Sequence, residues 1–274
     1  MFDSVDSRDG TRIAFHRDGA GPPVVLVGGG LTDHTENAPL AARLAADFTV
    51  YNYDRRGRGD SGDTAPYSVQ REIEDLAAIV EHAGGHGYAY GVSSGGALLL
   101  EAVLAGVEVD RLAVYEVPYS VDRFAQEAWR GYVDELVGLS GADAVELFMR
   151  FTGADDAEVV RARDSSSWPR LARLGETLSY DAACLGSTGA PPVDRLARLT
   201  NPTLVITGEP REDPHATAVT SDFFARAADE IVAAAPGAGR LVLPGQQHVA
   251  DPATVGDALT RFFSGGSLPA EEPR

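Results

Sequence analysis

The segment Gly91-Val92-Ser93-Ser94-Gly95 decides the fold of this chain. It fits the pattern Gly-x-Ser-x-Gly, which forms a sharp turn between a strand and a helix and pushes the serine hydroxyl into the open. Chance would supply roughly 0.2 copies in a chain this rich in glycine, so the context matters. A strand-like stretch at 88–90 precedes the segment, and an apolar, helix-like stretch at 97–104 follows it. The segment therefore predicts Ser93 as a nucleophile.

Strand-like and helix-like segments alternate on both sides of this turn. Each expected strand is a short apolar run bounded by turn residues. The expected strands are 24–27, 48–53, 88–90, 112–115, 203–207 and 240–243. The expected helices are 38–46, 68–80, 97–104, 223–234 and 252–263. This alternation is typical of the α/β class, with a mostly parallel central sheet and helices on both faces.

The alternation stops in the middle of the chain. Helical patterns without a convincing strand fill this region, which contains both tryptophans, Trp129 and Trp168. We therefore expect a helical cap that is inserted into the sheet domain. The expected domains are a core of residues 1–118 and 197–264, a helical cap at 119–196, and a disordered tail at 265–274.

The composition excludes several classes of function. The formal charge is −18, and all 23 basic residues are arginine. A surface this acidic repels phosphate backbones, so nucleic acid is not expected as a partner. Without lysine the chain can form neither the phosphate contact of a P-loop nor a Schiff base with a substrate.

The sequence also indicates where the protein works. The first residues lack the basic and apolar regions of a signal peptide, and no run approaches the roughly 18 apolar residues needed to span a membrane. Cys184 is the single cysteine, so it cannot form an internal disulfide. We therefore expect a cytoplasmic protein that has no membrane partner. The sequence leaves a homodimer open.

A serine nucleophile needs a base, and His248 best suits that role. It follows the last expected strand and precedes the last expected helix, as the order serine, acid, histidine requires. His34, near the glycine loop at 28–30, either lines the pocket or is a plain loop residue. No pair of histidines has the spacing of metal ligands, so neither a metal nor another cofactor is expected.

Acyl transfer by a serine also needs two backbone N–H groups that stabilise the developing negative charge, together called the oxyanion hole. One is expected from Ser94, the residue after the nucleophile, and the other from Gly30 in the loop Gly28-Gly29-Gly30-Leu31. Three glycines in a row could instead cradle a phosphate, but the fingerprint Gly-x-Gly-x-x-Gly is absent. We therefore favour Gly30 as an oxyanion donor.

Together these features resemble the α/β-hydrolase superfamily. The likeness extends from near residue 10 to near residue 264. It rests on the segments 24–30, 53–62, 91–96, 203–208 and 244–248. It implies the α/β-hydrolase fold and a catalytic triad of serine, histidine and acid. The chain has Gly28-Gly29 where the superfamily usually has His-Gly, which alters the pocket wall rather than the backbone donor.

The acid of the triad has two candidates. The resemblance places it after the strand at 203–207, but the usual aspartate position there holds Arg211, and Asp213 serves only if the loop carries a short insertion. Glu116 ends the strand that precedes the cap. The zearalenone lactone hydrolases resemble this chain in a glutamate at that place and in the segment Tyr115-Glu116-Val117-Pro118. We favour Glu116 and keep Asp213 as the alternative.

The expected function is hydrolysis of an apolar ester or lactone through an acyl-enzyme on Ser93. Leu31 and Trp168 are expected to contact the substrate, with Trp168 preferred to Trp129 because the serines at 165–167 suggest a loop. A serine rather than an aspartate as nucleophile excludes dehalogenases and epoxide hydrolases. The remaining alternatives are hydrolysis of a thioester or a carbon–carbon bond, a cyclisation, and ligand binding without turnover.

Overall fold

The structure, a computed structural model, describes residues 3–209 and 222–266 of the chain. The alternative acid Asp213 and most of the tail at 265–274 lie outside the described residues.

An eight-stranded sheet forms the centre of the described chain, in the order β1-β2-β4-β3-β5-β6-β7-β8. The strands from β3 to β8 pair in parallel, whereas β1 and β2 pair antiparallel at one edge. The strand bounds are β1 (Asp3–Asp6), β2 (Arg12–Asp18), β3 (Pro23–Val27), β4 (Thr49–Tyr53), β5 (Tyr88–Val92), β6 (Arg111–Tyr115), β7 (Thr203–Gly208) and β8 (Ala238–Leu243). The predicted mostly parallel sheet is confirmed.

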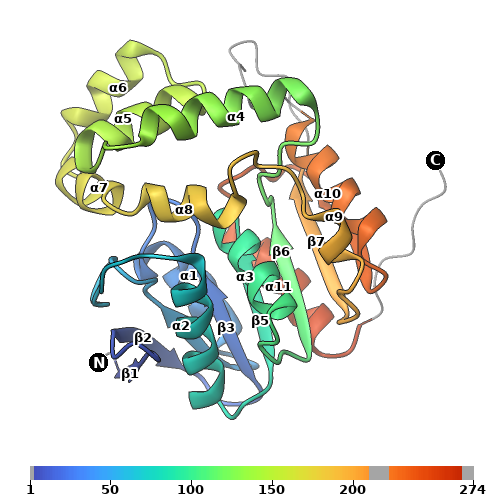
Figure 1. Cartoon of the computed structure of the whole chain (residues 1–274). Helices are drawn as coiled ribbons and strands as arrows, with labels where there is room; N and C mark the ends of the chain where they lie inside the picture. The colour runs from blue at the N-terminus through green and yellow to red at the C-terminus, as the bar shows by residue number, and fades with distance from the viewer. Residues whose placement is uncertain (1–2, 210–221, 267–274) are drawn as a thin grey trace.

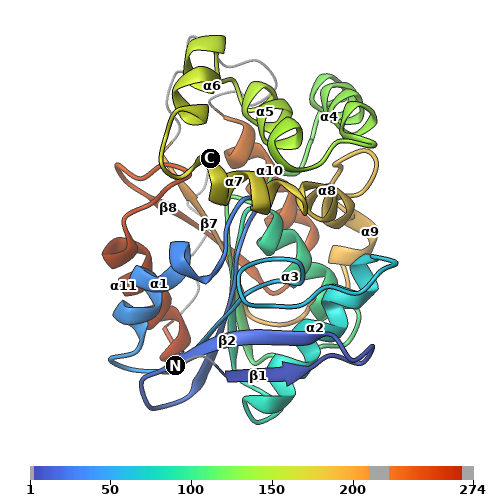
Figure 2. The same cartoon turned by 90° about the vertical axis from the view of Figure 1, so that its left-hand side faces the viewer.

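Helices cover both faces of the sheet, as predicted. Along β3, Val24 and Leu26 pack into a core shared with α1 and α11, while Val25 and Val27 face the opposite layer, which contains α2, α3 and α10. Figure 2 shows α1 and α11 on one side of the sheet and α2 on the other. The bounds are α1 (His34–Leu44), α2 (Val69–His82), α3 (Ser94–Leu104), α10 (Phe223–Ala234) and α11 (Pro252–Phe263).

The inserted segment forms a cap above the carboxyl ends of the strands (Figure 1). In this view α8 lies between the sheet and the outer helices α4, α5 and α6. The bounds are α4 (Arg123–Leu136), α5 (Gly141–Phe151), α6 (Asp156–Arg163), α7 (Trp168–Gly175) and α8 (Leu178–Leu185). The short α9 (Val193–Leu196) packs instead on α3 and α10 of the core. The domain boundaries at 118 and 196 stay predictions.

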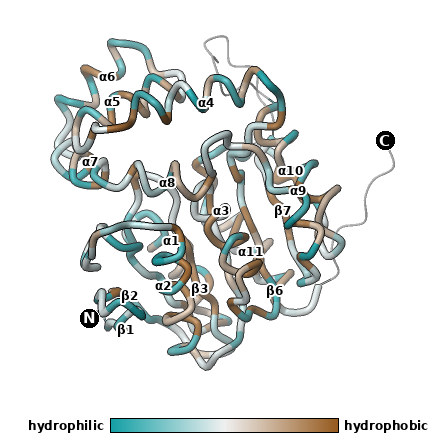
Figure 3. The backbone as a smooth tube through the Cα atoms, viewed as in Figure 1, coloured by the Kyte–Doolittle hydropathy of each residue, from teal (hydrophilic) through white to brown (hydrophobic). Residues whose placement is uncertain are grey.

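The interior is apolar, and hydrophobic residues concentrate along the central strands and α3 (Figure 3). In α3 the successive residues Leu98, Leu99 and Leu100 are all fully buried, because the helix lies between the sheet, α2 and α8. Full burial of each such side chain contributes about 1.5–3 kcal/mol. Among the residues that the structure describes, no helix is long and apolar enough to cross a membrane.

Candidate active site

Ser93 lies at a strained turn between β5 and α3. Its backbone angles, φ 56° and ψ −129°, fall in a region that favours glycine. The turn is tight because its glycines lack side chains. A Cβ at Gly91 would lie 2.6 Å from the Gly95 carbonyl oxygen, and a Cβ at Gly95 would lie 2.4 Å from the Gly28 carbonyl oxygen. The structure thus forms the strand, turn and helix that the sequence predicts at 91–95.

Three residues other than glycine have a left-handed backbone within the described chain. They are Leu31 (φ 54°), Ser93 (φ 56°) and Glu116 (φ 46°). These residues follow β3, β5 and β6, which are neighbours in the sheet. Such strain costs of order 1–3 kcal/mol each and collects at functional sites. The carboxyl ends of these three strands are therefore the candidate active site.

His248 and Glu116 meet at this edge of the sheet. His248 Nδ1 lies 2.8 Å from Glu116 Oε2. The second carboxylate oxygen, Oε1, accepts a hydrogen bond of 2.9 Å from the backbone N–H of Gly208, the last residue of β7. Glu116 is only 5% exposed, so its carboxylate is held by burial as well as by both contacts. When Nδ1 donates to this carboxylate, Nε2 of the imidazole is left free to act as a base.

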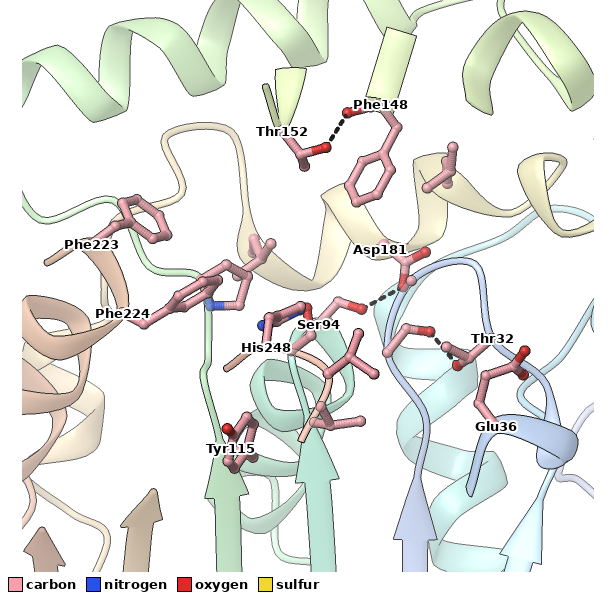
Figure 4. Close-up of a pocket in the computed structure, with 18 of the residues that line it drawn as sticks. Thr32, Glu36, Ser94, Tyr115, Phe148, Thr152, Asp181, Phe223, Phe224 and His248 are labelled. Atoms are coloured by element: carbon pink, nitrogen blue, oxygen red, sulfur yellow. Dashed lines mark hydrogen bonds between the residues drawn. The ribbon is translucent and has the colours of Figure 1, made fainter. Parts of the chain in front are cut away.

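Two aromatic residues hold the loop that carries the histidine. The Tyr115 hydroxyl donates a hydrogen bond of 2.6 Å to the carbonyl of Gln247, next to His248. Burial and the neighbouring Glu116 raise the pKa of Tyr115, which keeps this hydroxyl protonated as a donor. Phe224 on α10 stacks on the His248 ring, with centroids 4.8 Å apart and planes 10° apart (Figure 4). Tyr115 thus holds the backbone next to His248, and Phe224 contacts the imidazole itself.

A cavity of about 510 Å³ lies between the strand ends and the cap (Figure 4). Ser93, His248, Gly30 and Ser94 all line it. Most of the remaining wall is apolar, and no arginine is found among the described lining residues. Aromatic side chains on its wall include Trp129, Tyr132, Phe148, Phe151, Phe223 and Phe224. A cavity with this lining suits a neutral small molecule.

The glycine loop after β3 packs directly on the serine turn. A Cβ at Gly29 would lie 3.0 Å from Ser93 Cβ, so a side chain there would crowd the serine turn. Ser94 is the first residue of α3, where backbone N–H groups have no partner within the helix and carry the positive end of its dipole. The two segments expected to donate the oxyanion N–H groups therefore meet at Ser93.

The sequence that forms these strands and helices matches a known family. The sequence model of the Alpha/beta hydrolase family matches residues 24–258, from β3 into α11. This chain is an α/β hydrolase.

Relatives of this α/β hydrolase include solved structures and curated proteins. An α/β hydrolase from Sphaerobacter thermophilus DSM 20745 is 40% identical, with a TM-score of 0.82, and the match covers 95% of this chain and 100% of that chain. The putative non-heme bromoperoxidase BpoC of Mycobacterium tuberculosis is 28% identical, over 92% of this chain and 97% of that protein. The enol-lactonase from Burkholderia xenovorans LB400 is 20% identical with a TM-score of 0.68, over 95% of this chain and 97% of that chain, and shares the fold.

The two residues expected to contact the substrate of this α/β hydrolase are not among the described residues that line the cavity. Trp168 begins α7 and is not among the lining residues, whereas Trp129 on α4 is. The serines at 165–167 indicated a loop, but they form the turn that starts α7, in which the Trp168 N–H donates to the Ser165 carbonyl. Leu31 packs against the main core, and its neighbour Gly30 lines the cavity. That Leu31 and Trp168 contact the substrate stays a prediction.

A buried cluster of charges lies behind the glycine loop, and the sequence did not predict it. The segment 54–62 supplies Arg55 and Arg58, each 2% exposed. Arg55 pairs at 2.6 Å with Glu72 on α2 and at 2.6 Å with Asp181 on α8, and Arg58 pairs with Asp181 at 2.8 Å. Burial alone would raise the pKa values of both carboxyls, but the arginines outweigh burial and lower them. Both carboxylates therefore stay charged.

The fold also brings together two histidines that sequence spacing keeps apart. The rings of His16 and His34 stack with centroids 4.2 Å apart and planes 28° apart, and their ligand atoms lie within 4.8 Å of those of Asp60. His34 Nδ1 lies 3.0 Å from both oxygens of Asp54. His34 is not among the lining residues of the cavity, and it is the first residue of α1 rather than part of a loop.

Proposed function

We propose that this α/β hydrolase cleaves a carboxylic ester or lactone through an acyl-enzyme on Ser93. The main support is the contact of 2.8 Å between His248 Nδ1 and Glu116, which orients the imidazole in the cavity that Ser93 also lines. The chain order of serine, acid and histidine matches that of the elbow fold.

In the proposed reaction, His248 Nε2 removes the Ser93 proton as the hydroxyl oxygen attacks the carbonyl carbon. The N–H groups of Gly30 and Ser94 stabilise the negative charge that forms on the carbonyl oxygen. Glu116 holds the imidazole and balances the imidazolium. His248 then protonates the leaving alcohol as the tetrahedral intermediate collapses. Finally it activates a water molecule, which attacks the acyl-enzyme and releases the acid and free Ser93.

The chemistry of the cavity favours a neutral and bulky substrate. Its wall is largely apolar, and Glu36 and Asp181 are the acidic residues among those described on it, while no described lining residue is an arginine. An anionic group on the substrate would lose its hydration without gaining a cation from those residues, and the net charge of −18 repels it further. This balance favours esters and lactones over thioesters of anionic carriers. The name of the enol-lactonase of the same fold suggests lactones as test substrates.

Labelling with a fluorophosphonate tests the nucleophile. We expect one covalent adduct, located on Ser93 by peptide mass spectrometry, in the folded protein. Neither Ser93→Ala nor the heat-denatured wild type should be labelled, because the reaction needs the serine and the assembled site. Folded wild-type protein that carries no adduct would contradict the proposal and favour ligand binding without turnover.

A substrate panel separates ester hydrolysis from the other serine-dependent reactions. The panel contains neutral p-nitrophenyl esters of increasing acyl length, macrolactones and acyl thioesters. We expect the neutral esters or lactones to give the highest kcat/KM, because the cavity wall is apolar. Faster hydrolysis of the thioesters would move the assignment to thioester chemistry.

A further inference from the structure

A buried arginine lies directly behind the proposed oxyanion donor. Arg58 Nη1 donates a hydrogen bond of 2.5 Å to the carbonyl oxygen of Gly29. This carbonyl belongs to the same peptide group as the N–H of Gly30. In a trans peptide the C=O and N–H bonds point in opposite directions. The guanidinium therefore binds the oxygen side of the peptide and leaves the N–H directed away from itself.

The hydrogen bond affects the Gly30 N–H in two ways. It fixes the orientation of a peptide plane in a run of three glycines, which have little conformational preference of their own. It also polarises the peptide group, because a charged donor on the carbonyl strengthens the N–H as a donor. The Thr32 hydroxyl donates to the same Gly29 oxygen at 2.8 Å. The peptide is thus held by two donors.

Arg58 is in turn held by the cap helix α8. Its Nη2 donates to Asp181 Oδ2 at 2.8 Å, and its Nε donates to the Thr177 hydroxyl at 2.9 Å. Thr177 is the N-cap residue of α8, and Asp181 lies within that helix. The guanidinium therefore bridges the glycine loop and the cap.

Asp181 also reaches the residue that supplies the second donor. Its Oδ1 accepts a hydrogen bond of 2.7 Å from the Ser94 hydroxyl (Figure 4) and one of 2.6 Å from Arg55. One carboxylate of the cap thus contacts both the support of the Gly30 N–H and the side chain of Ser94. The two arginines, Arg55 and Arg58, balance the carboxylates of Asp181 and Glu72, so the cluster adds no net charge beside the nucleophile.

We propose that Arg58 is a positioning residue for the oxyanion hole. We also propose that Asp181, through its contact with Arg58, makes this positioning depend on the place of α8 against the core. The inference rests on the proposed function, because an oxyanion hole has a role only if Ser93 attacks a carbonyl. Arg58 is not among the described residues that line the cavity, so it acts through the peptide between Gly29 and Gly30. It therefore stabilises the transition state more than the bound substrate.

The variant Arg58→Gln tests this inference, and Arg56→Gln is its matched control. Arg56 comes from the same loop and is fully buried, but it pairs with Asp75 at 2.7 Å and with Asp9 at 3.0 Å. Both variants lose one buried guanidinium, so both should lower Tm. Below both transitions, we expect Arg58→Gln to lower kcat roughly 10- to 100-fold with KM changed by less than about 3-fold. We expect Arg56→Gln to change kcat by less than about 3-fold.

A second readout is inhibition by an aryl boronic acid, which forms a tetrahedral adduct on the nucleophilic serine. An oxygen of this adduct occupies the oxyanion hole, so the inhibition constant reports the strength of its donors. It should rise in Arg58→Gln by a factor similar to the loss in kcat and stay unchanged in Arg56→Gln. Arg58→Lys keeps a charged donor for the Gly29 oxygen and should recover part of kcat.

Asp181→Asn tests the dependence on the cap and replaces Arg58→Gln if that variant does not fold. It keeps an acceptor for Arg58 but removes the charge, and we expect kcat to fall roughly 10-fold. Equal kcat in Arg58→Gln and Arg56→Gln, or a kcat loss without a weaker boronic acid, would overturn the inference while ester turnover by the wild type upholds the proposed function. A wild-type protein with neither ester turnover nor a label on Ser93 would overturn both.

Discussion

Glu116 Oε2 lies 2.8 Å from His248 Nδ1, although the two residues are 132 positions apart in the chain. Glu116 directly follows β6 and His248 follows β8, so the pair spans the intervening strand β7. Between them, Gly208, the last residue of β7, donates its N–H to the second carboxylate oxygen of Glu116. The end of β6 thus supplies the carboxylate, and the end of β7 holds it in place by a hydrogen bond.

Removal of the Glu116 carboxylate is expected to lower kcat/KM by about 10³- to 10⁴-fold. Glu116→Gln keeps the side-chain volume, but its amide can donate to Nδ1 and stabilise the wrong tautomer of His248. Steady-state hydrolysis of a p-nitrophenyl ester measures the effect, with circular dichroism as the check on folding. Asp213→Asn is the comparison and should change kcat/KM by less than about 3-fold. The opposite ranking of these variants would assign the acid to Asp213.

The hydroxyl of Tyr115 is expected to stabilise the histidine loop. Tyr115→Phe removes the hydrogen bond that this hydroxyl donates to the Gln247 carbonyl, so the free energy of unfolding should fall by about 1 kcal/mol, and kcat should fall several-fold. Tyr119→Phe is the matched control, since this tyrosine is also buried but its hydroxyl has no hydrogen-bond partner among the described residues. Urea unfolding and ester turnover measure both variants. An equal loss of stability in the two would show that the bond to Gln247 contributes nothing.

Substrate selectivity should show which of the two tryptophans lies at the cavity wall. Trp129→Phe removes part of the wall and the donor that bonds to the Gly186 carbonyl at 2.8 Å. We expect KM for bulky esters to rise by about 10-fold, with a smaller change for an acetate ester that does not reach α4. Trp168→Phe should leave both KM values nearly unchanged. Kinetics with a short and a long p-nitrophenyl ester decide between them, and a larger effect of Trp168→Phe would contradict the assignment of Trp129.

Lowering the pH should reduce the free energy of unfolding of the wild type more steeply than that of the Asp181→Asn variant. In the folded protein the pKa of Asp181 lies below its ordinary value of 3.8, so the unfolded chain binds more protons and stability rises with pH in this range. The stabilisation from the charged Asp181 is complete above the ordinary pKa, and it is lost as the pH falls from there through the lower pKa of the folded state. Urea unfolding at about pH 6 and about pH 3.5 measures the difference for each protein. Equal pH slopes for the two proteins would refute this account of the carboxylate.

The parts of the fold and site that the sequence predicted depend on local patterns. The turn at 91–95 is determined by glycines on either side of a serine, and Glu116 and His248 were singled out because each follows a strand. The structure brings these two side chains together, and their catalytic roles stay predictions. The cytoplasmic location and the homodimer also stay predictions.

The parts that the sequence did not predict depend on contacts between distant segments. Arg55 and Arg58 lie in a polar, glycine-rich segment that is typical of an exposed loop, and Asp181 lies in a helix more than a hundred residues away. No local pattern distinguishes such a buried arginine from an exposed one. Trp129 was passed over for a similar reason, because its place above the cavity depends on how the cap helices pack.

The charge cluster of Arg55, Arg58, Glu72 and Asp181 also determines how the site responds to heat. Hydration of ions becomes less favourable as temperature rises, so the cost of keeping these groups away from water falls on warming. Apolar packing gains no comparable advantage. The glycine loop therefore depends on contacts that weaken least at high temperature, and the cap should remain joined to the serine turn until the sheet itself melts.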